Sequence, residues 1–226
     1  MNGIINERRQ FLLRTCIGVV FIACFAVFPA MAASLTVNVN DLAGLPLRDA
    51  VVSVVAKAGT HVPAHAPRTT EIEQKDREFI PYVTVVQTGT QVTFPNRDAL
   101  LHHVYSFSPA KSFEIKLYSG EPPRGVLFDK AGIVTIGCNI HDWMLGYIQV
   151  VDTPYFAKTG ADGRVVINDI VAGEFEVAVW HPTQRAPTIA KNLKIESRET
   201  AAIVLALDAV APKKRFKPPL DSVRYK

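Results

Sequence analysis

Two features are clearly missing from this sequence: a large excess of charge of one sign, and apolar residues that recur with the period of a helix. Its 25 basic and 21 acidic side chains leave a formal net charge of +4, an excess too small to predict a nucleic-acid partner. No stretch repeats its apolar residues with a helical period, and short strand-like segments separated by turns are found instead. The sequence therefore excludes a helical bundle and predicts an all-β protein.

Residues 1–32 have the composition of an export signal. Arg8, Arg9 and Arg14 precede an uncharged apolar run at residues 16–30, and Ala30-Met31-Ala32 is a small-x-small cleavage site. The run is shorter than the roughly 20 residues that span a bilayer, so we expect cleavage rather than a membrane anchor. Residues 8–12 also match the twin-arginine motif Arg-Arg-x-Phe-Leu. The expected location is the periplasm, reached by the Sec or the twin-arginine route.

Cysteine is scarce as well. Cys16 and Cys24 lie in the expected signal, so Cys138 would stand alone in the mature chain. Exported proteins usually pair their cysteines, and a lone thiol therefore suggests a reactive or ligating role. The alternative is a buried free cysteine that acts as a small hydrophobic residue. Cleavage also removes three arginines and one glutamate, which lowers the formal charge from +4 to +2.

Short strands are predicted along most of the mature chain. Residues 35–40 alternate apolar and polar side chains, residues 49–57 are rich in valine, and residues 59–76 are polar and aperiodic, which predicts a long loop. Further strands are expected at residues 82–87, 91–95, 102–108, 113–118, 125–128, 133–137 and 146–151. This spacing favours an antiparallel sandwich or barrel.

A second all-β unit is predicted to begin at Thr153-Pro154. Its strands are expected at residues 164–167, 174–180, 193–196 and 200–207, and prolines among lysines and arginines beyond Ala211 indicate a flexible basic tail. The predicted organisation is a signal at residues 1–32, a first β domain at 33–152, a small β-sandwich at 153–208 and a tail at 209–226.

The stretch Cys138-Asn139-Ile140-His141-Asp142-Trp143-Met144 carries the most chemistry. It places a thiol, an imidazole and a thioether in the spacing Cys-x-x-His-x-x-Met. A thiolate, two imidazoles and a weak axial thioether form the donor set of trigonal copper electron-transfer sites. The second imidazole would come from upstream, where His102 and His103 lie in a predicted strand.

The segment from Phe79 to Val151 resembles the cupredoxins, the small blue copper proteins such as plastocyanin and amicyanin. The resemblance is carried by the spacing from Cys138 to Met144, by the strand at residues 92–96 ending in Asn96, and by His102 six residues later. It implies a Greek-key β-sandwich that holds one type 1 copper ion by His102, Cys138, His141 and Met144. The His-His-Val-Tyr-Ser-Phe and Cys-Asn-Ile-His-Asp-Trp-Met segments also look like exported proteins labelled as methylamine utilisation proteins, a label that implies a pathway without establishing one.

The choice between His102 and His103 stays open. Adjacent strand residues point to opposite faces, so only one of them can easily enter the site, and the count from Asn96 favours His102. The family usually places an asparagine after this histidine, where it braces the two ligand loops, and His103 departs from that pattern. His103 is therefore the alternative ligand, or it orients a ligand from behind.

Met144 and His141 also have structural interpretations that involve no metal, and Trp143 and His181 need an interpretation as well. Met144 could fill a gap in the core, and His141 could be a polar loop residue. Trp143 either forms an apolar docking patch around an exposed edge of His141 or packs the loop in place. His181 follows a strand and is interpreted as structural.

The appended unit has a weaker resemblance. Residues 41–52 and 161–180 resemble transthyretin-like or carboxypeptidase regulatory-like β-sandwich repeats, mainly in their turns and alternating valines. The hairpin at residues 35–57 could therefore pair with the C-terminal unit, but we assign it to the first domain.

From these features we expect an exported copper protein that transfers single electrons between partner proteins. We do not expect an enzyme, because nothing resembles an open catalytic position with a neighbouring acid or base. One alternative is a copper carrier with a more exposed site. Another is a structural or binding β-sandwich in which the Cys-His-Met loop is accidental. We expect no nucleic-acid partner. We also expect no stable insertion in the membrane once the signal is cleaved.

Overall fold

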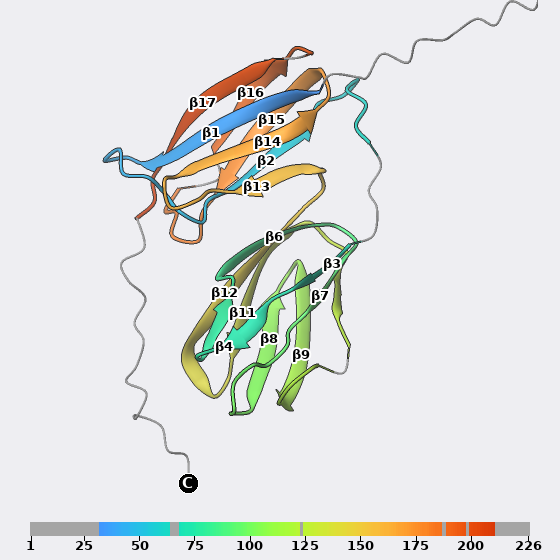
Figure 1. Ribbon diagram of the computed structural model, residues 1–226, viewed down its shortest axis with the longest axis vertical. Coiled ribbons are helices and arrows are strands. Elements are labelled where there is room, and N and C mark those ends of the chain that lie inside the picture. Colours follow the sequence, from blue (N-terminus) through green and yellow to red (C-terminus); the bar gives the residue numbers. More distant parts are fainter. Residues whose placement is uncertain (1–31, 64–67, 123, 187–188, 198, 211–226) are drawn as a thin grey trace, which may run out of the picture. The chain divides into compact units, whose positions relative to one another are not determined.

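The computed structural model describes residues 32–63, 68–122, 124–186, 189–197 and 199–210, which form two β-sandwiches (Figure 1). The expected signal, up to residue 31, and the basic tail from residue 211 lie outside these residues. The described part of the chain contains no helix, and hence none of the length and apolarity that crossing a membrane requires. The all-β prediction is confirmed.

One sandwich is built from both ends of the described chain, and we call it the N/C sandwich. One of its sheets has the order β14-β1-β17 and the other has the order β13-β2-β15-β16. Its strands are β1 (Ala33–Asp41), β2 (Val51–Ala56), β13 (Tyr155–Lys158), β14 (Arg164–Ile170), β15 (Gly173–Trp180), β16 (Ile189–Ile195) and β17 (Thr200–Leu207).

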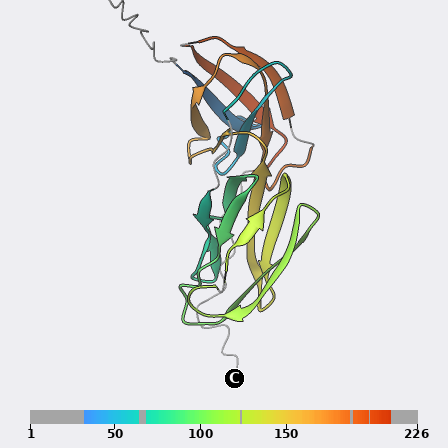
Figure 2. The same ribbon diagram turned by 90° about the vertical axis from the view of Figure 1, so that its right-hand side faces the viewer.

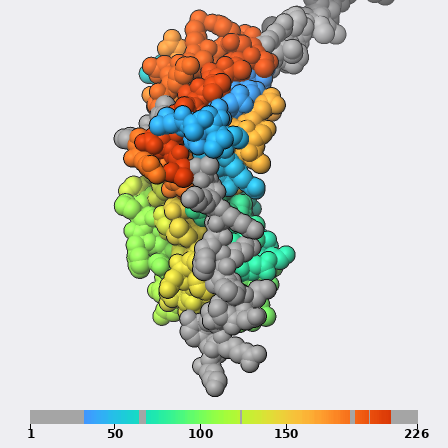
Figure 3. Space-filling view, turned by 90° about the vertical axis from the view of Figure 1, so that its left-hand side faces the viewer, coloured from blue at the N-terminus to red at the C-terminus, as the bar shows by residue number. Residues whose placement is uncertain are grey.

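The place of β1 corrects the predicted domain boundary. The strand runs parallel to β17 from the pair Ser34–Thr200 to the pair Asp41–Leu207, and it is antiparallel to β14 on its other edge. In the space-filling view, the blue residues of the amino-terminal segment lie directly beside the orange and red residues of the C-terminal strands (Figure 3). Residues 33–57 therefore belong with the C-terminal strands and not with the domain that carries the Cys-His-Met motif.

Side-chain burial explains this pairing. Alternate residues of β1, namely Ala33, Leu35, Val37 and Val39, are buried in a core whose other members come from residues 47–54 and 155–209. Burying each such aliphatic side chain contributes roughly 1.5–3 kcal/mol, and the alternating apolar face of β1 packs into the core that the strands of the N/C sandwich share.

The second sandwich is inserted between β2 and β13, and we call it the central sandwich. A five-stranded sheet of order β6-β12-β11-β8-β9 packs against a three-stranded sheet of order β10-β7-β3; its strands are drawn in green to yellow in Figure 2. The strands are β3 (Thr69–Glu71), β6 (Val83–Gln87), β7 (Thr90–Thr93), β8 (His102–Ser108), β9 (Lys111–Tyr118), β10 (Val126–Phe128), β11 (Gly132–Cys138) and β12 (His141–Val151).

Part of the predicted loop at residues 59–76 is strand instead. β3 pairs parallel to β7, and β4 (Glu73–Lys75) forms a hairpin with β5 (Glu78–Ile80). Each of these strands has only three residues, which is too short for alternation to be visible in the sequence. The hairpin matters for the site because its turn contacts the loop that leads into β8.

Candidate metal centre

A tight turn brings Cys138 and His141 together. Cys138 ends β11, His141 begins β12, and the two residues pair across the turn at Asn139 and Ile140. The next pair in the ladder joins Gly137 to Leu145, so Asp142, Trp143 and Met144 have no partners on β11. This bulge turns both His141 and Met144 inward, although they stand three residues apart and simple alternation would place them on opposite faces.

His102 completes the cluster from β8, which pairs with β11. The Cys138 Sγ atom lies 3.9 Å from His102 Nδ1 and 3.8 Å from His141 Nδ1, and the three donor atoms all lie within 4.8 Å of one another. The three side chains are buried, with exposed fractions of 0, 3 and 2 % for His102, Cys138 and His141. Residues separated by 36 positions in the sequence thus converge on one point.

The spacing of these atoms fits a bound metal ion. With metal–sulfur and metal–nitrogen bonds of about 2.3 and 2.0 Å in tetrahedral or trigonal geometry, each S···N separation would be about 3.6 Å. The two S···N separations in the structure are 3.8 and 3.9 Å, close to that value. A thiolate with two imidazoles is a soft donor set that suits copper.

Met144 lies in the same apolar core as Cys138. Its side chain is 2 % exposed, and it packs in the cluster that includes Val104 and Ile136. The bulge in β12 therefore places the thioether on the inner side of the sheet, in the core that also contains Cys138.

His103 points away from the cluster. Its ring Nε2 lies 2.9 Å from Glu114 Oε1 on β9, and the ring packs 5.5 Å from that of Tyr105. Its backbone N–H donates a hydrogen bond of 3.5 Å to Cys138 Sγ. The structure thus groups the ring of His102 with Cys138 and His141, while His103 supports the sulfur through its main chain.

A carboxylate that the sequence analysis did not single out holds His102 from the other side. The Nε2 atom of His102 lies 2.7 Å from Asp98 Oδ2. Asp98 also accepts hydrogen bonds from the backbone N–H groups of Asp76 (2.7 Å) and Arg77 (2.9 Å) in the β4–β5 turn. The only signal in the sequence was an acidic residue four positions before His102, in a loop that Asn96 organises by bonding to the Leu100 and Tyr118 carbonyls.

The electrostatics of the cluster favour a thiolate. Burial raises the pKa of Cys138, but hydrogen bonds from His102 and from the backbone N–H groups of His103 and Ile140 outweigh burial, and the net pKa is lowered. Burial lowers the pKa of His102, but its contacts with Cys138 and Asp98 outweigh burial and raise the net pKa. The pKa of His141 is lowered by burial and by the nearby charges of His102 and Arg77, so His141 has a free nitrogen lone pair at neutral pH.

The edge of His141 is less exposed than expected. The residue is only 2 % exposed because its ring packs 4.9 Å from that of His102 and 5.3 Å from that of the half-buried Trp143. Trp143 therefore contacts the cluster from outside, and its own half-buried ring, not an exposed edge of His141, reaches the surface.

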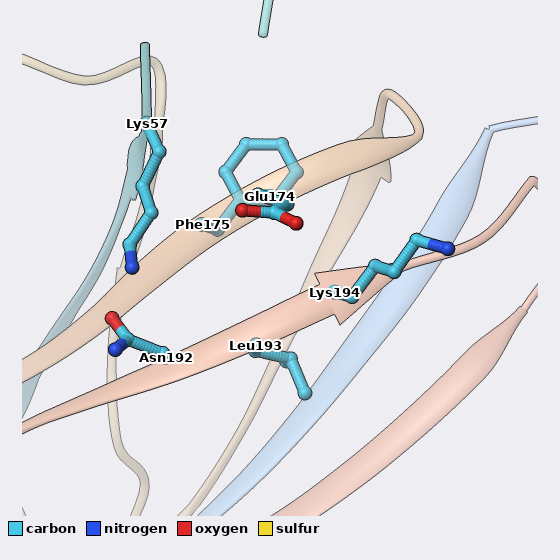
Figure 4. A pocket seen from close by; sticks show the side chains of 6 residues that line it. All are labelled: Lys57, Glu174, Phe175, Asn192, Leu193 and Lys194. Carbon is cyan, nitrogen blue, oxygen red and sulfur yellow. The ribbon is translucent and has the colours of Figure 1, made fainter. Parts of the chain in front are cut away.

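A separate shallow pocket of about 210 Å³ opens in the N/C sandwich over β15 and β16 (Figure 4). Lys57 and Asn192 extend toward one another across it, whereas Lys194 points away and pairs with Glu196 at 2.6 Å. The pocket mixes charges of both signs and holds no thiol or imidazole among its lining residues.

Comparisons with known proteins gave only distant likenesses. No family model matches the sequence, and no curated protein does. Similar solved structures include a purple cupredoxin from Nitrosopumilus maritimus, with 20 % identity and a TM-score of 0.32 over 37 % of this chain and 98 % of that one. A reduced amicyanin mutant has 21 % identity and a TM-score of 0.34 over 46 % of this chain and 99 % of that one.

A third similar structure is a copper-containing nitrite reductase from Thermus scotoductus. It has 22 % identity and a TM-score of 0.35 over 44 % of this chain and 25 % of that one. At these scores the likeness carries no argument about function, which rests instead on the donor atoms of this chain.

Proposed function

We propose that this protein is a periplasmic type 1 (blue) copper protein that transfers single electrons between partner proteins. The observation that carries the proposal is the convergence of His102, Cys138 and His141, whose buried donor atoms lie within 4.8 Å of one another. A bound copper ion would supply a one-electron redox couple at this position.

The residues of this chain would hold and shield that ion. Cys138 would supply a thiolate, which its lowered pKa favours, and His102 and His141 would supply their Nδ1 atoms. Met144, which lies in the same core as Cys138, would offer its thioether as a weak fourth donor. Burial of His102, Cys138 and His141 excludes water from these three donors, and the pairing of β8, β11 and β12 would hold the donors in one arrangement when the metal changes its oxidation state.

Burial of the donors favours electron transfer over copper carriage. A carrier that exchanges metal readily would present its donors near the surface, whereas His102, Cys138 and His141 are each at most 3 % exposed. Electron transfer tolerates burial because the electron crosses the protein while the ion stays in place.

Partner proteins would dock where the cluster lies nearest the surface. Trp143 is half-buried and contacts the His141 ring, and Leu100 and Leu101 in the loop before His102 are 50 and 51 % exposed. We propose that these apolar side chains contact redox partners during transfer. The role is one of transfer between proteins and not of catalysis on a substrate.

The optical spectrum of the copper-loaded chain tests the proposal. Addition of Cu²⁺ to the protein expressed without residues 1–32 is expected to give an intense thiolate-to-copper band and the narrow spin-resonance splitting of type 1 copper. Cys138→Ser removes the only thiol of that protein and is expected to abolish the band. His61→Ala, which removes an exposed histidine, is the matched control and is expected to leave the spectrum unchanged.

The other outcomes separate the alternatives. A protein that binds Cu⁺ through Cys138 but forms no coloured Cu²⁺ complex would be a carrier. A protein that takes up no copper would leave a structural or binding β-sandwich, and the electron-transfer proposal would be rejected.

A further inference from the structure

We propose that Asp98 is a positioning residue for the copper site and that the β4–β5 turn holds its carboxylate in place. The inference rests on the proposed copper site and extends it to residues 76, 77 and 98, to which no function has been attached so far. It is drawn from the hydrogen bonds that link these residues to His102.

The Asp98 carboxylate joins three donors. Oδ1 accepts from the Asp76 N–H at 2.7 Å, and Oδ2 accepts from the Arg77 N–H at 2.9 Å. Oδ2 also lies 2.7 Å from His102 Nε2. The side chain of Asp98 is 15 % exposed, while that of His102 is completely buried. The carboxylate therefore connects a buried imidazole to a turn near the surface.

The turn has the conformation of an anion-binding nest. Asp76 and Arg77 have φ angles of 53° and 59°, and both are in the left-handed region that residues other than glycine rarely adopt. Two consecutive N–H groups in such a turn point to the same side and can grip one anion. A two-residue hairpin of this kind usually uses Asn-Gly or Asp-Gly, so the arginine here is held in place by contacts such as the carboxylate.

The carboxylate in turn fixes the imidazole. An ionised carboxylate can only accept hydrogen bonds, so His102 Nε2 must carry the hydrogen. That assignment leaves Nδ1 as the atom that faces Cys138 Sγ, 3.9 Å away. Without Asp98, a buried Nε2–H would have no acceptor and the ring would be free to rotate about its Cβ–Cγ bond or change tautomer. Outer partners of ligating histidines orient the ligand in this way.

The Asp98→Asn variant tests the inference. An asparagine oxygen in the place of Oδ2 could still accept from His102 and from the Arg77 N–H, but the amide NH₂ group in the place of Oδ1 would then oppose the Asp76 N–H, donor against donor. The measurement in the metal-free protein is ¹⁵N–¹H correlation NMR of the His102 ring. The wild-type ring is expected to show a slowly exchanging, hydrogen-bonded Nε2–H, and in the variant, where an uncharged amide oxygen accepts less strongly, this hydrogen is expected to exchange faster.

A second measurement uses Cu⁺ with a competing chelator. Loss of an outer partner typically lowers metal affinity by about 10–100-fold, and we expect Asp98→Asn to fall in that range. Asp129→Asn is the matched control, because Asp129 pairs with Lys111 at the surface and the same charge is removed.

The outcomes decide the inference separately from the proposed function. A wild-type His102 ring protonated at Nδ1 alone would overturn it, whether or not the variant folds. A variant with unchanged Nε2–H exchange and unchanged Cu⁺ affinity would overturn it too. If wild type and Cys138→Ser bind Cu⁺ equally, the proposed copper site fails, and the His102 signal still decides whether Asp98 positions the ring.

Discussion

His102 and His103 are neighbours in β8, yet the strand gives them opposite surroundings. The His102 ring faces the sulfur of Cys138, and the His103 ring faces Glu114 on β9. His103 contributes to the cluster only through its backbone N–H, which bonds to Cys138 Sγ. A side chain that touches nothing in the site can be removed without removing this main-chain donor.

This asymmetry leads to a prediction. His103→Ala is expected to keep copper binding and the thiolate-to-copper band, because the N–H of residue 103 remains. The same variant is expected to lose about 1–3 kcal/mol of unfolding free energy, because it removes a buried ring and its contact with the exposed Glu114. His102→Ala is expected to lower Cu⁺ affinity by more than 100-fold, beyond the roughly 10–100-fold effect of an outer partner.

Chelator competition with Cu⁺ and urea unfolding measure the two effects on the same samples. If His103→Ala abolished copper binding while His102→Ala retained it, the two histidines would have exchanged roles, and the assignment of the site would be wrong.

The sequence was sufficient to predict the candidate metal donors, but not the residues and the backbone geometry that hold them in place. The spacing from Cys138 to Met144 and the count from Asn96 pointed to the residues that the structure brings together. The bulge at Asp142–Met144 and the bonds of Asp98 could not be predicted, because both depend on which strands lie beside them. The alternation of apolar and polar residues indicates which face of the sheet a side chain lies on, but it does not indicate which residue of a neighbouring strand pairs with it.

At the scale of the element, the same limit applies to the strands. Alternating valines in β1 and β15 predicted strands, and both are present. The parallel pair between β1 and β17 joins residues more than 160 positions apart, and nothing local in either segment specifies the other. The assignment of residues 33–57 to the wrong sandwich follows from that lack of local information.

The end of β15 is fixed by a buried histidine. His181 is fully buried, its Nε2 lies 3.0 Å from the Arg48 carbonyl, and its Nδ1 lies 3.2 Å from the Thr183 N–H. These partners suit a neutral ring that donates from Nε2 and accepts at Nδ1. Burial lowers the pKa of His181, and the Arg48 carbonyl and Asp49 offset that effect only in part.

A pH dependence of stability follows. In the unfolded chain His181 takes up a proton below its ordinary pKa of 6.5, whereas in the folded chain it stays neutral until a lower pH. The unfolded state therefore binds more protons, and the free energy of unfolding falls as the pH drops below about 6.5, by at most about 1.4 kcal/mol per pH unit. Above that pH this histidine adds no pH dependence.

Urea unfolding between pH 8 and pH 5.5 measures the slope. His181→Gln is expected to reduce the acid-side slope relative to wild type, even if it lowers stability at every pH. His61→Gln changes an exposed histidine and is expected to leave the slope unchanged. Equal slopes for wild type and His181→Gln would show that the buried ring titrates normally.

At the scale of the whole molecule, the central sandwich is an insertion into the N/C sandwich. Every residue of the core around Cys138 lies between positions 72 and 150. Every buried residue of the N/C core lies in residues 33–54 or 155–209. The two cores therefore draw on separate stretches of sequence, and only one of those stretches is continuous.

The fragment of residues 68–152 is accordingly expected to fold alone and to keep the copper band of the full chain. It contains both sheets of the central sandwich, all four proposed copper ligands, and the Asp98 contacts to the β4–β5 turn.

The fragment of residues 153–210 is expected to stay unfolded. It lacks β1, which lies between β14 and β17, and β2, which lies between β13 and β15, so three of its strands would have no neighbour in a sheet. Circular dichroism and thermal denaturation of the two fragments check both expectations, and adding a peptide of residues 33–57 to the second fragment should restore its strands. An unfolded 68–152 fragment, or a folded 153–210 fragment, would contradict the division of the chain that the two cores imply.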